Sequence, residues 1–111
     1  MRLLVVDDDP STLFVLSRLL RSEGHEVDTA ASGALALERI RTVAYEALLT
    51  DLVMPGMSGL DLLQEAIALS EGLLCIVITG QPAPAPDLRG GAIWLQKPLD
   101  FDALLAVLKR D

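Results

Sequence analysis

The chain has 111 residues, enough for one domain with a single hydrophobic core, which we take to span residues 1–111. Its net charge of −7, without any basic cluster, argues against direct binding to nucleic acid. The single cysteine, Cys75, lies in an apolar run and excludes an internal disulfide, which fits a reducing, cytoplasmic location. No apolar run approaches the ~18 residues of a membrane span, and Met1 directly before the first expected strand indicates that the domain opens its chain.

The first predicted strand is Leu3–Val6, a continuously apolar run that suits a strand buried on both faces. Asp9 is placed to cap the following helix, with Pro10 at its first position, where a missing N–H costs nothing. Gly24 is expected to lie just after the end of this helix. The predicted apolar stripe of the helix consists of Leu13, Phe14, Val15, Leu16, Leu19 and Leu20.

The same pattern then repeats. Glu26–Ala30 alternates weakly and predicts a second short strand. Ser32 is expected to cap a helix that runs to about Thr42. The side chains predicted to turn inward from that helix are Leu35, Leu37 and Ile40. Ala47–Thr50 predicts a third strand, which delivers Asp51 at its C-terminal tip.

The second half of the chain continues the alternation of strands and helices. A loop at Met54–Ser58 precedes a third helix, which is expected to end near Gly72. Leu74–Ile78 and Ala92–Gln96 predict two further strands, and Asp100 is expected to cap a last helix. This alternation predicts βαβ units with right-handed crossovers and a parallel sheet.

Four of the five predicted strands end in a polar functional group: Asp7 and Asp8, Asp51, Thr79, and Lys97. The C-terminal ends of parallel strands meet at one edge of the sheet, where ligands of open α/β sheets bind. Taken singly, each residue has an ordinary explanation as a helix cap, a turn residue or part of an exposed loop. Together they require four coincidences, so we favour a functional site.

The residue types at this edge suit phosphoryl transfer. Clustered carboxylates repel one another and need a cation, and their hard oxygen atoms suit Mg²⁺. A carboxylate such as Asp51 is an acceptable nucleophile, which would give an acyl phosphate. Lys97 would pair with one phosphoryl oxygen, and Thr79 would donate a hydrogen bond to another.

These segments, as a set, resemble the response-regulator receiver domain of two-component signalling over essentially the whole chain. The matching segments are Val5–Pro10, Thr50–Gly59, Ile78–Gly80 and Lys97–Pro98. The resemblance implies a flavodoxin-like, three-layer α/β/α fold around a five-stranded parallel sheet of order 2-1-3-4-5. It also implies a signalling phosphoacceptor that assists only its own phosphorylation and dephosphorylation, and no enzyme in the usual sense.

The resemblance further implies a role for individual residues. Asp51 would be the phosphoacceptor, and Asp7, Asp8, Asp51 and the backbone carbonyl of Val53 would bind Mg²⁺. Thr79 would be the switch hydroxyl, and Lys97 the lysine that pairs with the phosphoryl group. The implied donor is a phosphohistidine on a sensor histidine kinase or phosphotransfer protein, and the implied reader is an output domain or a protein partner.

Two features leave questions open. Trp94, the only tryptophan, falls at the aromatic switch position of the family, but it could equally just cover the sheet edge. Between Gly80 and Ala92, alternating prolines forbid a helix interior, so we expect the fourth helix of the family to be shortened or absent, with at most one turn at Pro86–Arg89. We also expect the loop Gln81–Gly91 to become ordered on phosphorylation or partner binding.

Two other functions are compatible with parts of the sequence. One is a pseudo-receiver that acts purely as an interaction module, although such domains usually lack the acceptor or the acidic pair. The other is a phosphatase of the haloacid-dehalogenase type, since Asp7–Ser11 approximates the nucleophile motif D-x-D-x-(T/V) of those enzymes. Such a phosphatase needs further acidic metal ligands after the lysine, and the chain ends soon after Lys97.

Overall fold

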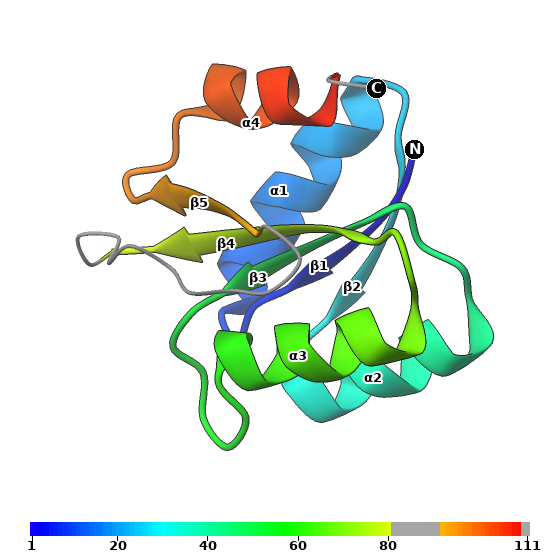
Figure 1. Cartoon of the computed structure of the whole chain (residues 1–111). Coiled ribbons are helices and arrows are strands. Elements are labelled where there is room, and N and C mark those ends of the chain that lie inside the picture. Colours follow the sequence, from blue (N-terminus) through cyan, green and yellow to red (C-terminus); the bar gives the residue numbers. More distant parts are fainter. Residues whose placement is uncertain (81–91, 110–111) are drawn as a thin grey trace.

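Five parallel strands form one sheet in the order β2-β1-β3-β4-β5 (Figure 1). The computed structural model of the chain describes residues 1–80 and 92–109. The strands are β1 (Arg2–Val6), β2 (Glu26–Ala30), β3 (Ala47–Asp51), β4 (Leu74–Thr79) and β5 (Ile93–Gln96). The helices of the described residues are α1 (Pro10–Ser22), α2 (Gly33–Thr42), α3 (Gly59–Leu69) and α4 (Phe101–Leu108).

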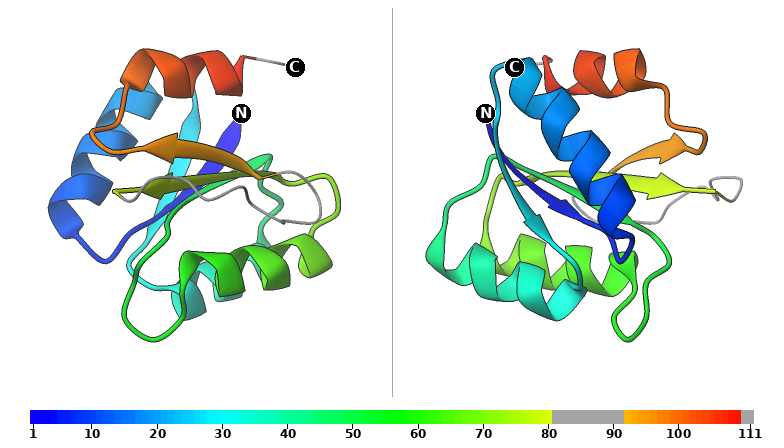
Figure 2. Two further views of the ribbon diagram at one scale, coloured as in Figure 1. Left: turned by 60° about the vertical axis from the view of Figure 1, so that its left-hand side comes forward. Right: turned by 180° about the vertical axis from the view of Figure 1, so that it is seen from behind.

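The helices cover the sheet from both sides. Helices α1 and α4 lie on one face, and α2 and α3 lie on the other (Figures 1 and 2). The predicted flavodoxin-like fold, its three layers and its strand order are therefore confirmed. The prediction of a shortened or absent helix between β4 and β5, with its expected ordering on phosphorylation, falls on residues 81–91, outside the described residues.

The central strand β1 explains why its sequence is apolar without interruption. Leu4 and Val6 pack into the cluster beneath α2 and α3, whereas Leu3 and Val5 pack into the cluster beneath α1 and α4. All four side chains are at most 1% exposed. Side chains alternate between the two faces of a strand, so a strand with helices on both faces needs apolar residues at every position.

Several local signals in the sequence are confirmed by the backbone. The Asp9 carboxylate accepts a hydrogen bond from the Ser11 amide at 3.0 Å and caps α1. Ser32 and Asp100 cap α2 and α4 in the same way. Gly24 follows the C-cap of α1 with a φ of +92°, a conformation that glycine adopts without strain.

For two helices, fewer of the apolar side chains are buried than the sequence predicted. In α2, Leu37 is buried but Leu35 is 49% exposed, because two positions along a helix turn the side chain by about 200°. In α1, Leu16 and Leu20 are buried, whereas the exposed members of the predicted stripe are Phe14, Val15 and Leu19. A run of apolar residues in a helix thus predicted more burial than the packing against the sheet provides.

Cys75 is buried on β4, as predicted, and burial raises the pKa of its thiol to about 11. Of the helices in residues 1–80 and 92–109, none combines the length and the apolar character that crossing a membrane requires.

Truncation of two leucines in α2 tests which face of this helix packs against the sheet. We expect Leu37→Ala, at a side chain that is 4% exposed, to lower the free energy of unfolding by about 2–5 kcal/mol. Leu35→Ala removes the same atoms from a half-exposed position in the same helix and should cost less than about 1 kcal/mol. Urea denaturation followed by circular dichroism measures both, and equal losses would contradict the assignment of the buried face.

Candidate functional site

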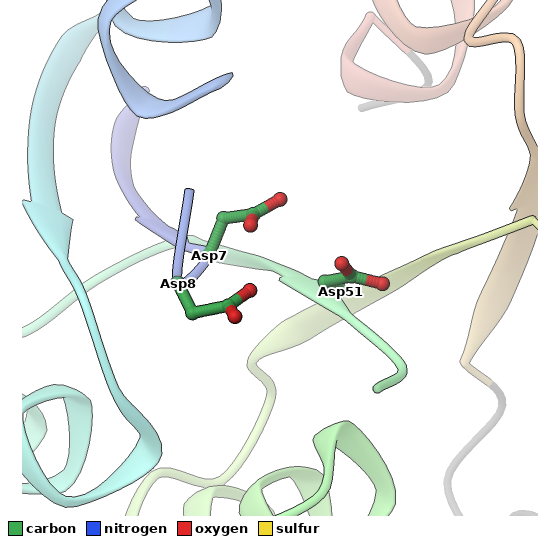
Figure 3. Close-up of side chains that lie close together, drawn as sticks. All are labelled: Asp7, Asp8 and Asp51. Carbon is green, nitrogen blue, oxygen red and sulfur yellow. The ribbon is translucent and has the colours of Figure 1, made fainter. Parts of the chain in front are cut away.

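The polar strand ends predicted from the sequence lie together at one edge of the sheet. Strand β3 pairs with β1 through Thr50 and Val6, and with β4 through Asp51 and Ile78. Asp7 and Asp8, which follow β1, therefore lie beside Asp51. Figure 3 shows these three side chains projecting from neighbouring strand ends into a common space.

Backbone hydrogen bonds hold the strand ends in place beyond the regular sheet. The Asp7 amide donates to the Ala30 carbonyl at 3.2 Å, and the Leu52 amide donates to the Ile78 carbonyl at 3.1 Å. The Lys97 amide donates to the Thr79 carbonyl at 2.7 Å. Each functional residue therefore belongs to, or directly follows, a backbone that the sheet fixes.

The three carboxylates form a compact cluster. Asp7, Asp8 and Asp51 each offer one oxygen, and these oxygens lie within 4.8 Å of one another. Asp7 is buried, Asp51 is partly buried and Asp8 is exposed. Hard oxygen ligands that include an exposed member fit a cation such as Mg²⁺, which retains several of its water ligands. The Val53 amide lies 3.4 Å from Oδ1 of Asp51, so the main chain of Val53 also borders the cluster.

The ionised form of Asp7 is disfavoured in the metal-free fold. Burial raises the pKa of its carboxyl group above the ordinary value, and the nearby charge of Asp51 raises it further. The Asp9 amide opposes this shift by donating to Oδ1 of Asp7 at 2.9 Å, and the charge of Lys97 opposes it as well. A cation in the cluster would favour the ionised form of Asp7, because its charge would offset both the cost of burial and the repulsion from Asp51.

Lys97 contacts the predicted acceptor directly. Its Nζ atom lies 3.2 Å from Oδ2 of Asp51, with the lysine side chain 42% exposed and the aspartate side chain 14% exposed. The peptide bond between Lys97 and Pro98 is cis. The 3.2 Å contact places the ammonium group where it can meet negative charge that builds up on the Asp51 carboxylate.

Thr79 and Trp94 occupy neighbouring strands. Thr79 is 1% exposed at the end of β4, and Trp94 on β5 pairs in register with Val77, two residues earlier on β4. Thr79, Val77 and Trp94 therefore share the sheet face that α2 and α3 cover. Trp94 packs against the core on that face, and its indole Nε1 is buried with no hydrogen-bond partner among the described residues. This placement suits both interpretations of Trp94, as a switch or as a cover of the sheet edge.

One polar residue beside the predicted acceptor was not predicted from the sequence to belong to the site. Thr50 is fully buried, and its Oγ1 donates a hydrogen bond to the main-chain carbonyl oxygen of Asp51 at 2.9 Å. The available signal was a single hydroxyl in an otherwise apolar strand. Such a group needs a partner when it is buried, and the backbone of the acceptor supplies it.

The acidic cluster and its paired lysine lie at the carboxyl edge of a doubly wound parallel sheet, which is the edge where ligands of such sheets bind. The family described as the response regulator receiver domain matches residues 3–109 of the chain. The chain therefore belongs to the response-regulator receiver domain family.

Curated relatives agree with this assignment. The transcriptional regulatory protein ZraR of Escherichia coli strain K12 is 38% identical over 112 residues, which cover 97% of this chain and 25% of that protein. The transcriptional regulatory protein TcrA of Mycobacterium tuberculosis is 33% identical, with coverage of 97% and 44%. The chain thus spans about a quarter to under half of the length of these relatives.

Solved structures show the same fold. A CheY-like receiver domain protein of Methanospirillum hungatei superposes with a TM-score of 0.90 at 33% identity, covering 97% of this chain and 90% of that one. The response regulator TrrA of Thermotoga maritima, solved with Mg²⁺ and BeF, gives a TM-score of 0.88 at 32% identity, covering 98% and 96%.

Neutralising Asp7 tests the electrostatics of the cluster. The pKa of Asp7 is higher in the folded chain than in the unfolded chain, so protonation of Asp7 stabilises the folded state. This stabilisation is fully present at pH values below the pKa of Asp7 in the unfolded chain. That contribution is lost as the pH rises through the folded pKa. Asp7→Asn mimics the protonated form, so we expect it to raise the free energy of unfolding at pH 7 without metal. The gain should shrink as the solution is acidified.

Urea denaturation in EDTA at several pH values measures this effect. The matched control is Glu65→Gln, at an exposed position on α3 away from the cluster, which should change the stability by less than about 0.5 kcal/mol. A destabilised Asp7→Asn variant at pH 7 would contradict the interpretation.

Proposed function

We propose that this domain accepts a phosphoryl group from a phosphohistidine onto Asp51 in a two-component phosphorelay, with Mg²⁺ bound beside it. The observation that carries the proposal is the pairing of Asp51 with Lys97 at 3.2 Å, next to the carboxylates of Asp7 and Asp8. The family is a signalling domain and not an enzyme in the usual sense. Asp51 is consumed stoichiometrically in this role and does not turn over a substrate.

In the proposed step, a carboxylate oxygen of Asp51 forms a bond to phosphorus while the bond from phosphorus to the histidine nitrogen breaks. The leaving imidazole keeps that electron pair and takes up a proton. Lys97 moves its interaction from the carboxylate to the phosphoryl oxygens, and the Thr79 hydroxyl donates to another of them. Asp7, Asp8, Asp51 and the Val53 carbonyl would hold Mg²⁺, which supplies neutralisation of phosphoryl charge.

The donor histidine lies outside the 111 residues of this chain. His25 is the only histidine of the chain, and it directly precedes β2 at the amino edge of the sheet, opposite the site. The partner must approach closely enough for its histidine to reach Asp51. Next to the site, a cavity of about 430 Å³ borders both Asp7 and Lys97.

The surface around this cavity suits such a partner. Two exposed apolar side chains of α1, Val15 and Leu19, line this cavity together with Leu99 and Phe101. Exposed apolar side chains gathered in one place are typical of a protein contact surface. These features support docking of a sensor histidine kinase or phosphotransfer protein over α1. We further propose that the phosphorylated domain is read by an output domain or a protein partner.

A phosphorylation assay tests the acceptor. After incubation with acetyl phosphate and Mg²⁺, intact mass spectrometry should find one added phosphoryl group on the parent and none on Asp51→Asn. The fluorescence of Trp94 recorded in parallel reports whether β5 senses the modification. An unmodified parent, with binding of Mg²⁺ confirmed by titration, would overturn the proposal in favour of an interaction module.

The role of Lys97 is tested against the second lysine of the chain. Lys97→Ala should slow phosphorylation by acetyl phosphate roughly 10²-fold, because a positioned charge is lost from the transferring group. Lys109→Ala, at the end of α4, should leave the rate unchanged. Rates from intact mass at fixed times distinguish the two variants, and equal rates would remove Lys97 from the mechanism.

Turnover separates the proposal from the phosphatase alternative. The receiver proposal predicts no sustained hydrolysis of p-nitrophenyl phosphate, because Asp51 would be phosphorylated once per chain. Release of many equivalents of p-nitrophenol, abolished by Asp7→Asn, would favour the phosphatase instead.

A further inference from the structure

Gly59 opens α3 directly against the backbone of the proposed acceptor. A Cβ atom at this position would overlap the carbonyl oxygen of Asp51 and lie 3.0 Å from Cα of Leu52. Both are main-chain atoms of the chain segment that carries the site. Since these atoms cannot rotate away as the end of a side chain can, any side chain at position 59 must displace the backbone of Asp51 or α3 itself.

The carbonyl oxygen of Asp51 is also held from a second side. Thr50 Oγ1 donates to it at 2.9 Å, and the Thr50 side chain is fully buried. The Gly59 amide donates to the Leu52 carbonyl at 2.9 Å, which ties the first turn of α3 to the next peptide. The peptide that links Asp51 to Leu52 is therefore fixed between a buried hydroxyl and the first residue of a helix.

This peptide determines where two parts of the site lie. The Asp51 carboxylate extends from its amino side, and the main chain of Val53 follows on its carboxyl side, with its amide 3.4 Å from Oδ1 of Asp51. A displacement here shifts the carboxylate relative to Asp7 and Asp8, which belong to a different strand end. Misplacement of reacting or ligating groups by about 1 Å can cost 10²-fold in rate.

We propose that Gly59 is a positioning residue for the phosphoacceptor site. Together with Thr50, it holds the Asp51–Leu52 peptide so that the Asp51 carboxylate lies within reach of the cation held by Asp7 and Asp8. This inference rests on the proposed function for its metal and phosphoryl readouts. Its effect on the backbone does not depend on that function and is measured separately.

Gly33 provides a matched control in the same structural setting. Both glycines are the first residue of a helix, both directly follow a serine N-cap, and both are buried. The three atoms nearest to a Cβ at Gly33, however, all belong to the side chain of Met57, with the Sδ atom nearest at 2.8 Å. Gly33→Ala therefore tests the cost of crowding at a buried helix start without pressing on the backbone of Asp51.

The experiment compares Gly59→Ala with Gly33→Ala in the whole chain. Isothermal titration calorimetry with MgCl₂ should show a dissociation constant raised about tenfold or more for Gly59→Ala, within the 10–100-fold range typical of residues that orient metal ligands. Gly33→Ala should remain within about twofold of the parent, and phosphorylation by acetyl phosphate should follow the same order. Thermal unfolding in EDTA measures the stability that each variant loses. A loss of stability alone would indicate only a structural role for the glycine.

A metal-free readout separates this inference from the proposed function. In EDTA, amide resonances of residues 51–53 should shift in the ¹⁵N–¹H spectrum of Gly59→Ala and stay in place in Gly33→Ala. If the parent binds no Mg²⁺, the proposed function fails, while these shifts still decide the backbone claim. Unshifted resonances, or an unchanged affinity for Mg²⁺ in a Gly59→Ala variant that has merely lost stability, would overturn the inference.

Thr50 decides the outcome if Gly59→Ala does not fold. Thr50→Val keeps the shape of the side chain but removes the hydrogen bond to the Asp51 carbonyl, whereas Thr50→Ser keeps that bond. We expect Thr50→Val to shift the amide resonances of residues 51–53 and to weaken binding of Mg²⁺ about threefold, with Thr50→Ser close to the parent. Parent-like behaviour of Thr50→Val would overturn the inference.

Discussion

The arrangement of this domain depends on the repulsion among three carboxylates at the end of two central strands. Asp7, Asp8 and Asp51 would move apart if they lay on flexible chain, because like charges a few ångströms apart raise one another's free energy. Strand pairing prevents this, since β1 and β3 are neighbours and the backbone after each strand is still hydrogen-bonded. The raised pKa of Asp7 reflects first its burial and then the nearby charge of Asp51, both of which follow from its fixed position at the end of β1.

The rest of the fold makes such a site tolerable. Two helices cover each face of the sheet, and an apolar cluster lies beneath each pair of helices. Burial of these apolar side chains offsets the free-energy cost of placing the carboxylates close together. The cluster also keeps contact with water through Asp8 and with a counter-charge through Lys97. Burial behind the site and partial exposure at its mouth are therefore both required, because full burial would shift the carboxyl groups to their neutral forms.

The sequence predicted most of the fold and which polar residues lie together at one edge of the sheet, for identifiable physical reasons. Uninterrupted apolar runs with a polar end are typical of the strands of a doubly wound sheet, and this pattern predicts that Asp7, Asp51, Thr79 and Lys97 lie at the same edge. Helix limits followed from caps such as Asp9 and Ser32 and from Gly24. These signals are local, and each acts within a few residues.

Properties that depend on packing between elements were not predictable in the same way. The exposure of Leu35 and Phe14 follows from how α2 and α1 lie on the sheet, and composition alone gave the opposite expectation for Leu35. Similarly, nothing in the spacing of Thr50 and Gly59 indicated that Thr50 donates to the carbonyl oxygen of Asp51 or that a Cβ atom at position 59 would overlap this oxygen. That contact depends on the path of the loop between β3 and α3.

The position of that contact indicates how chemistry and folding are joined in this chain. Thr50 belongs to the buried core layer, Asp51 belongs to the site, and Gly59 begins the helix that covers β3 and β4. A change in the charge or position of the Asp51 carboxylate therefore acts on a peptide whose other neighbours are the core and α3. A close-packed interior has low compressibility and transmits strain. A displacement of Asp51 would therefore also displace the core residues and the first turn of α3. The Asp51 carboxylate is thus coupled through one peptide to both the core and α3.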